Sequence, residues 1–188
     1  MAGATWDRLR FDGAELGEVR LRLATEIDWR AILAMVLDPS TLAGIGDNRE
    51  YVEKTLRRLW YEEPETSGLR HFVVERAEYG DVIAYLRLEY PLFEPKCLWL
   101  TFFVVAPGMR GQGYGRRIMG LLKGEAERSG CVAKFGVHTS EDNAPATGLY
   151  HAMGFECVKR EPWESSTGNR TQRLTFCWTP AEAADGAS

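Results

Sequence analysis

The segment Val104–Gly115, VVAPGMRGQGYG, joins an apolar run to a turn with glycine at positions 111, 113 and 115. Glycine has no Cβ, so a ligand can closely approach the backbone of such a turn. Where the turn also opens a helix, free backbone N–H groups and the positive end of the helix dipole bind phosphate. Arginines at 110, 116 and 117 flank the turn and favour a ligand with several phosphate oxygens, such as a pyrophosphate.

Two common phosphate-binding patterns do not fit this turn. A Walker sequence needs lysine after its last glycine, but Tyr114 follows Gly113. A dinucleotide-binding G-x-G-x-x-G sequence needs glycine where Arg116 stands. The remaining interpretations are a different phosphate ligand or a tight turn that binds nothing.

Length and composition are typical of one globular domain. The chain has 188 residues, 45% of them hydrophobic and 27% charged. We predict a single domain over residues 19–179, with a loose N-terminal segment at 1–18 and a loose tail at 180–188. The net charge of -4 provides no basic field for a phosphate backbone, so no nucleic acid partner is expected.

No apolar run resembles a signal peptide or a membrane span, so we expect a cytoplasmic protein without a membrane partner. The cysteines form no C-x-x-C pair and are expected to be reduced thiols. His71 and His151 lack partners at metal-ligand spacing, so no metal is expected. The four cysteines are Cys97, Cys131, Cys157 and Cys177.

Hydrophobic periodicity and capping signals predict the element order βααβββαβαββ. The strand at 98–105 shows almost no alternation of polar and apolar residues, which is typical of a central strand covered on both faces. We therefore predict an α/β (α+β) fold with a central mixed sheet of about seven strands and helices on both faces. The expected strands are 19–23, 71–76, 82–90, 98–105, 134–139, 155–159 and 173–178; the expected helices are centred on 32–37, 52–60, 118–126 and 143–153.

A second pattern follows the glycine turn. Asn143 is a residue type that caps helices, and Tyr150 lies two turns later on the same helix face. Together the motifs resemble the GNAT superfamily of N-acetyltransferases over about residues 98–156, and the predicted element order extends the resemblance over 19–178. The matching residues are Arg110-x-x-Gly113-x-Gly115, Asn143-x-x-Ala146-x-x-Leu149-Tyr150 and Gly154-Phe155.

The resemblance implies that acetyl-CoA is the cofactor. Its pyrophosphate would bind the main-chain amides of the turn, and its pantetheine would bind the backbone of a strand that splays from its neighbour. The N–H near Val104 would be the oxyanion donor. The implied cofactor-binding residues are Phe103, Val104, Val105, Arg110, Gly111, Gln112, Gly113, Tyr114, Gly115, Arg116 and Asn143.

The reaction implied by the resemblance is direct attack of a neutral amine on the thioester, through a tetrahedral intermediate. Tyr150 takes the place of the family's general acid; a core aromatic is the alternative interpretation. Many relatives carry a glutamate base where this chain has Trp99. His138, five residues before Asn143, is the candidate base, with a buried structural histidine as its alternative. Glu89 and Glu94 are weaker candidates.

The acceptor implied is the amine of a small molecule or of a peptide or protein, and a homodimer is possible within the family. Because the strand glutamate is missing, a non-catalytic acyl-CoA sensor is an alternative function. A nucleotide-binding domain that uses the same turn is a third interpretation.

Overall fold

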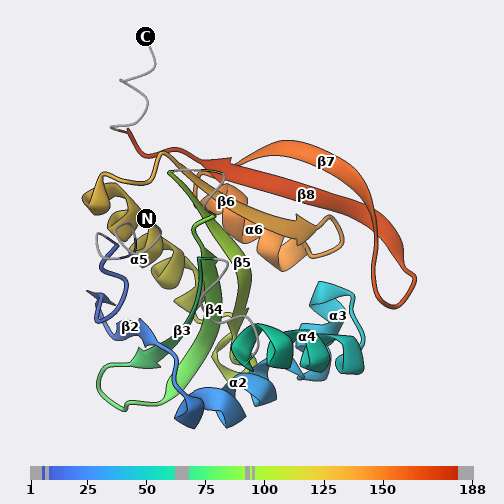
Figure 1. Ribbon diagram of the computed structural model, residues 1–188, viewed down its shortest axis with the longest axis horizontal. Helices are drawn as coiled ribbons and strands as arrows, with labels where there is room; N and C mark the ends of the chain where they lie inside the picture. The colour runs from blue at the N-terminus through green and yellow to red at the C-terminus, as the bar shows by residue number, and fades with distance from the viewer. Residues whose placement is uncertain (1–5, 7–8, 62–67, 92–93, 95, 182–188) are drawn as a thin grey trace.

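One mixed sheet runs through the computed structural model, which describes residues 6, 9–61, 68–91, 94 and 96–181 (Figure 1). Within these residues its strand order is β1-β2-β3-β4-β5-β6-β8-β7, and β5–β6 is the parallel pair. The strands are β1 (Glu15–Leu16), β2 (Val19–Leu23), β3 (Leu69–Arg76), β4 (Val82–Glu89), β5 (Cys97–Val105), β6 (Lys134–Ser140), β7 (Glu156–Glu164) and β8 (Arg170–Trp178).

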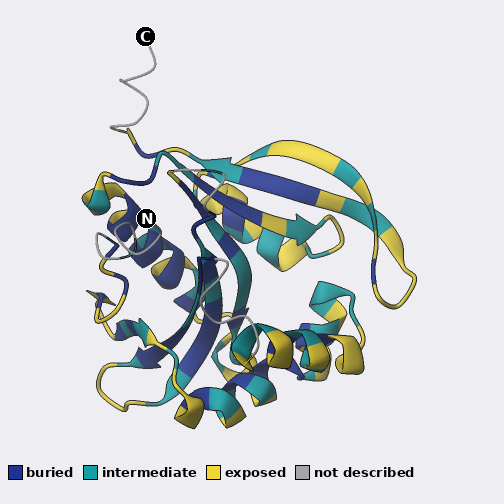
Figure 2. Ribbon diagram, in the orientation of Figure 1, coloured by how far each residue is buried: buried dark blue, intermediate teal, exposed yellow. Residues whose placement is uncertain are grey.

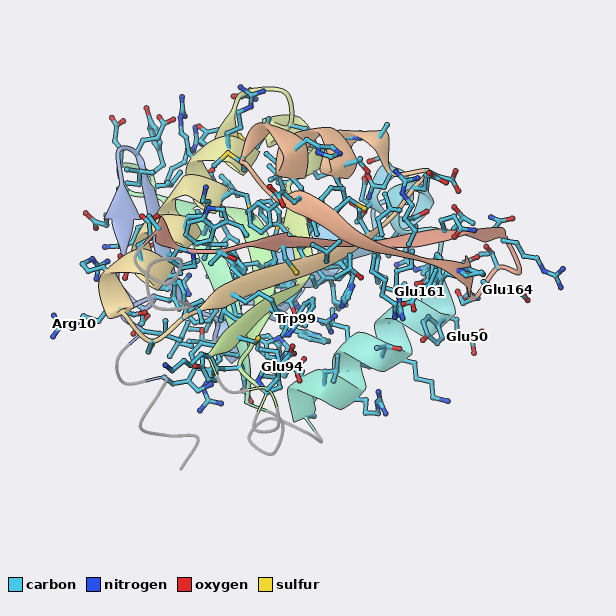
Figure 3. The ribbon with its side chains drawn as sticks, turned by 90° about the horizontal axis from the view of Figure 1, so that it is seen from above. Arg10, Glu50, Glu94, Trp99, Glu161 and Glu164 are labelled. Carbon is cyan, nitrogen blue, oxygen red and sulfur yellow. The ribbon has the colours of Figure 1, made fainter. Side chains whose placement is uncertain are left out.

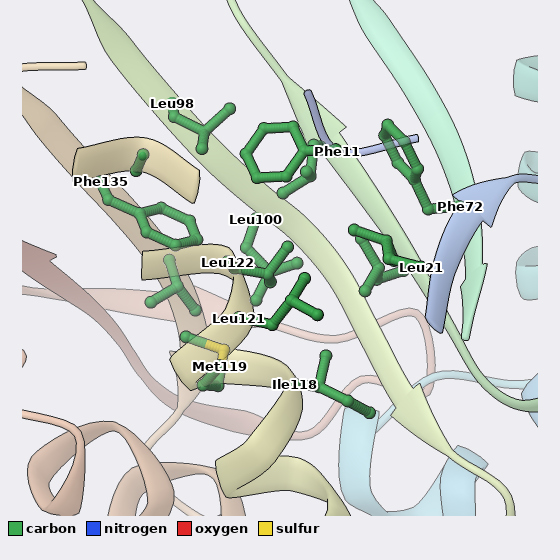
Figure 4. Packing of buried hydrophobic residues seen from close by; sticks show 14 of the residues in the cluster. Phe11, Leu21, Phe72, Leu98, Leu100, Ile118, Met119, Leu121, Leu122 and Phe135 are labelled. Carbon is green, nitrogen blue, oxygen red and sulfur yellow. The ribbon is translucent and has the colours of Figure 1, made fainter. Parts of the chain in front are cut away.

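Helices cover both faces of the sheet, as the sequence predicts. The α5 helix packs Ile118, Met119 and Leu122 against one face (Figure 4), whereas α2 and α4 pack against the other through Ile32 and Leu56. No described helix has the length and apolar character to cross a membrane. The helices are α2 (Trp29–Val36), α3 (Pro39–Ile45), α4 (Arg49–Tyr61), α5 (Tyr114–Ser129) and α6 (Ala144–Ala152), with 3-10 turns η1 (Glu26–Asp28) and η2 (Pro107–Met109).

The N-terminal segment differs from the loose segment that we expected. Leu9, Phe11 and Ala14 are buried in the main core, and the Phe11 ring lies 6.0 Å from that of Phe72 (Figure 4). The two-residue strand β1 adds an eighth strand to the predicted seven. These apolar residues follow no helical or strand period, so their burial depends on contacts distant in sequence. Residues 1–5, 7–8 and 182–188 lie outside the described part.

The stretch between the first two predicted helices was expected to be a loop, but it contains the helix α3. Asp38 caps this helix by accepting a hydrogen bond from the Ser40 backbone N–H (2.9 Å), and Pro39 begins it. Gly46 ends it with a left-handed φ of 75°. Start and stop signals were therefore present, although Pro39 also fits the end of the preceding helix.

β5 and β6 separate towards their carboxyl ends. Their parallel pairing extends from Cys97 and Lys134 to Leu100 and Val137, although β5 continues to Val105 and β6 to Ser140. A bulge at Thr101 shifts the register of β5 against β4 at the same level, and such bulges bend a strand. The separation leaves the end of β5 without a pairing strand on its β6 side among the described residues.

Burial is concentrated at the centre of the sheet and falls along the β7–β8 hairpin (Figure 2). Most β7 residues are exposed, and both strands are longer than predicted. The outer half of this hairpin extends past the sheet towards α3 (Figure 1). Its sequence, REPWESSTGNRTQR, has too few apolar residues to give a strand signal.

Candidate functional site

A cavity of about 360 Å³ lies where β5 and β6 separate. One wall comes from α4 and the loop before it, and β4 and β5 form its back. The opposite wall comes from β6 and α6. Among the predicted site residues, Phe103, His138, Asn143 and Tyr150 line it.

The glycine turn stands at the N-terminus of α5. Gly111 and Gly113 have left-handed φ values of 74° and 85°, and Gly113 is the N-cap. A Cβ built on either glycine would meet nothing within 4 Å. The turn therefore presents open backbone at the positive end of a 16-residue helix, which suits an anionic group.

The side chains of the turn mainly stabilise the turn itself. Arg110 donates from Nε to the carbonyl of Val105 (2.9 Å) and from Nη1 to Ser40 Oγ (2.7 Å), so it joins the end of β5 to α3. Gln112 donates to the Gly108 carbonyl (2.8 Å). The Tyr114 side chain is buried in the core, whereas Arg116 is exposed. Ligand contact at this turn would thus come from the backbone and from Arg116.

The two sequence motifs meet in space. A Cβ on Gly115 would lie 3.4 Å from Leu149 Cδ2, so the start of α5 packs closely on α6. Asn143 caps α6 by accepting a hydrogen bond from the Ala146 backbone N–H (3.3 Å). This cap fixes the direction of α6, whose inner face carries Tyr150 into the cavity.

Tyr150 is 5% exposed and packs between Phe155 and Phe176, with ring centroids 6.0 and 5.7 Å away. Burial raises the pKa of its phenol above the usual tyrosine value. No described residue forms a hydrogen bond with its hydroxyl. The neutral phenol of Tyr150 therefore faces the cavity with no hydrogen-bond partner in the part of the chain that the structure describes.

His138 faces the same cavity from β6. Its Nδ1 lies 3.1 Å from Thr175 Oγ1, and its ring stacks on Trp99 with centroids 4.7 Å apart. Partial burial, together with the charge of Arg173, lowers the pKa of His138. The imidazole is therefore neutral near pH 7 and has a lone pair available for a proton.

The two weaker base candidates lie elsewhere. Glu94 pairs with Lys134 (2.8 Å) and accepts from Trp99 Nε1 (2.8 Å), and the lysine contact lowers the pKa of Glu94 (Figure 3). Glu89 has a raised pKa because it is partly buried. Neither of them lines the cavity. Trp99, which replaces the glutamate of many relatives, supports His138 instead.

The β7–β8 hairpin lines one side of the cavity with Trp163 and Arg173, and its tip is bound to the loop before α4. Ser166 donates its backbone N–H to Asp47 Oδ1 (2.9 Å), and its Oγ accepts from the Asn48 backbone N–H (3.0 Å). Thr167 Oγ1 donates to the Gly46 carbonyl (2.9 Å). We name these contacts between the tip and residues 46–48 the hairpin seam.

Comparison with protein families gives a match over residues 30–155 to the acetyltransferase (GNAT) family, which is more than half of the chain. The chain belongs to this family. No curated protein sequence matches it significantly.

Solved structures of GNAT proteins share its fold. A spermidine N-acetyltransferase from Vibrio cholerae, in complex with CoA and spermine, superposes with a TM-score of 0.70 at 17% identity, covering 89% of this chain and 98% of that one. A structure assigned as a phosphinothricin N-acetyltransferase gives 0.69 at 21% identity, covering 86% and 98%. A structure from Salmonella typhimurium, assigned as an acetyltransferase with its cofactor acetyl-CoA, gives 0.66 at 22% identity, covering 88% and 96%. At these identities the likeness shows the fold alone.

Sequence reasoning missed Asp47 and Arg87 as residues of the GNAT cavity. Asp47 belongs to the loop before α4, and Arg87 is on β4; Trp163, an aromatic of the hairpin that the sequence offered as a cleft residue, also lines the cavity. Asp47 carried no signal beyond that of a helix start. Arg87 did carry a signal, because it is a charged residue within the otherwise apolar run VIAYLRL.

The Trp99 stack depends on a glycine of the neighbouring strand. A Cβ on Gly136 would lie 2.5 Å from the Trp99 ring, which is held by both Glu94 and His138. We expect Gly136→Ala to lower the free energy of unfolding by about 1–3 kcal/mol because the ring must shift. Urea unfolding measures this change.

The matched control for this variant is Gly124→Ala, where the new Cβ meets nothing within 4 Å and helix propensity favours alanine by up to about 1 kcal/mol. Adding Trp99→Leu to Gly136→Ala should recover part of the loss. Equal stability of the two alanine variants would contradict the close contact.

Proposed function

We propose that this GNAT protein is an acetyl-CoA-dependent N-acetyltransferase that acetylates a primary amine of a small molecule or of a peptide or protein. The observation that carries the proposal is the separation of β5 and β6 beside the open glycine turn. Tyr150 and His138 face the cavity that this separation creates. A ternary complex with direct transfer to the amine follows from the shared cavity.

The described residues fit acetyl-CoA. The backbone N–H groups of residues 111–115 and the N-terminus of α5 suit a pyrophosphate. The end of β5, at residues 103–105, is paired with β4 but not with β6, so its β6 side offers backbone groups for an extended chain of amides. Asn143, the N-cap of α6, lines the same cavity as the end of β5. When bound, acetyl-CoA supplies an acetyl group activated as a thioester.

Two side chains would then move protons. Neutral His138 accepts a proton from the amine, either directly or through a water molecule. Tyr150 donates its phenolic proton to the leaving sulfur, or stabilises it through a hydrogen bond. Thr175 and Trp99 hold the imidazole in place while this occurs.

The pH dependence of the reaction tests the role of His138. Its imidazole must be neutral to accept a proton, so kcat/KM should rise with pH through a pKa below the usual histidine value. We expect His138→Gln to remove this low-pH limb from the profile. His151→Gln, an exposed histidine on α6, should leave the limb unchanged. An unaltered limb in His138→Gln would assign the base elsewhere.

The proposed function is tested by following acetyl-CoA consumption and acetylated product by chromatography. The panel should contain polyamines, amino acids, peptides with free N-termini and lysine peptides. A thiol-reactive dye is unsuitable because the chain has four cysteines. Turnover of one class supports the enzyme. Tight binding of acetyl-CoA with no turnover would favour the acyl-CoA sensor, and light scattering would test whether the chain forms a homodimer.

A further inference from the structure

Arg87 introduces a positive charge into the wall of the cavity. It lies on β4, pairs in register with Phe102 of β5, and its guanidinium carbon lies 5.2 Å from the centre of the Phe102 ring. Both residues line the cavity, as does Tyr85 on the same face of β4. Arg87 therefore stands at the back of the space that holds His138 and Tyr150.

The Arg87 side chain has no hydrogen-bond or ion-pair partner among the described residues. Its Nε is sealed from solvent and forms no hydrogen bond, and no described carboxylate lies within ion-pair distance of it. Glu89 interacts with Arg87 only through long-range charge attraction, without a hydrogen bond or an ion pair. By contrast, Arg173, the second arginine that lines the cavity, donates to Glu161 (2.8 Å).

The neighbouring titratable groups do not compensate this charge. His71 pairs with Arg87 in register from β3, and burial lowers its pKa to about 4, so it is neutral. The Tyr85 hydroxyl lies 2.7 Å from His71 Nδ1, and burial raises the pKa of Tyr85. Asp47 lines the opposite side and accepts from Ser166. Arg87 is half-buried with its Nε sealed from solvent, and a cation in such a position is unfavourable without an acceptor unless a ligand supplies one.

We infer that the amine acceptor also carries a carboxylate, and that Arg87 binds this carboxylate while the amine faces His138. The acceptor is thus a small amino carboxylic acid. This inference rests on the proposed function and specifies its substrate class. The planar guanidinium fork matches a carboxylate in geometry and charge, whereas a polyamine would bring a second cation towards Arg87.

Matched acceptor pairs test this inference. Each pair consists of an amino acid and its α-carboxamide, so the amine and side chain are constant and the carboxylate is removed. We expect kcat/KM to favour the amino acid by at least about tenfold. In Arg87→Met this preference should disappear. Arg173→Met is the matched control, because it removes a paired arginine of the same cavity. In this variant the preference for the amino acid over its amide should persist.

Each alternative outcome overturns the inference. Equal use of acid and amide, higher kcat/KM for polyamines than for amino acids, or a carboxylate preference that survives Arg87→Met would each do so. All three results leave the proposed acetyltransferase intact, because they are all measured as turnover.

A binding measurement covers the case in which no amine is acetylated, which would reject the proposed function. Calorimetry with the CoA-loaded protein then compares each amino acid with its amide. Tighter binding of the acid, lost in Arg87→Met, still supports a carboxylate site at Arg87; equal binding overturns it.

Thermal unfolding of the Arg87→Met variant gives a second, independent measurement. Arg87→Met should be as stable as the parent or more stable, because a half-buried charge without a carboxylate partner is removed, and a large loss of stability would show that the Arg87 charge has an internal partner.

Discussion

The variant Gly113→Glu should lose acetyl-CoA binding, with an affinity more than about a hundredfold weaker than that of the parent. Gly113 is the N-cap of α5 and lies in the open turn. The new side chain would place a carboxylate against the proposed pyrophosphate position, where two negative charges repel. Calorimetric titration with acetyl-CoA measures the loss directly.

The control must separate this effect from backbone strain, because Gly113 has a φ of 85° that disfavours glutamate. Gly130→Glu meets this need. Gly130 also has a left-handed φ, of 61°, with nothing within 4 Å of its Cβ position, but it ends α5 instead of starting it. We expect Gly130→Glu to retain acetyl-CoA affinity. Parent-like affinity in Gly113→Glu would refute a cofactor site at the turn.

Tyr150→Phe should lower kcat by about a hundredfold and change acetyl-CoA affinity by less than about threefold. The substitution removes one hydroxyl, which no described residue binds, so the fold loses no hydrogen bond. The Phe ring keeps the packing against Phe155 and Phe176. Steady-state kinetics and a separate binding titration distinguish the two effects.

Tyr90→Phe is the control for removal of a buried phenol. Tyr90 is 9% exposed and donates to the carbonyl of Cys131 (3.0 Å), away from the cavity. This variant should lose some stability and keep its turnover. If Tyr150→Phe retained parent turnover, the phenol would be a packing residue and the sulfur would be protonated by another group.

Local sequence signals predicted the part of the fold that lies around the turn. The apolar strand at 98–105, the helix between Gly113 and Gly130, and the cap at Asn143 all appear in the structure. Each of these features depends on residues that are close to it in the sequence, within about the length of one helix. The predicted mixed sheet with helices on both faces was also confirmed, because the elements that form it carry local signals of this kind.

Long-range contacts account for what the sequence alone left out. Phe11 is buried because a distant strand covers it, and nothing near it in the chain indicates this. The β7–β8 hairpin is held by strand pairing in spite of its polar sequence. Arg87 was recognisable as a charge in an apolar strand, but only the structure shows that none of the described residues gives its side chain a hydrogen bond or an ion pair. The roles of Tyr150 and His138 remain predictions.

The hairpin seam has a consequence for how this protein can change over evolution. The outer half of the hairpin, residues 160–172, supplies Trp163 to the cavity, while few of its side chains are buried. Its sequence can therefore drift, and its length can change, at little cost to the stability of the core. Because the glycine turn, which is the proposed cofactor site, and the hairpin are separate parts of the chain, we expect that new acceptors can be acquired by altering the hairpin while the proposed chemistry at the thioester is inherited unchanged.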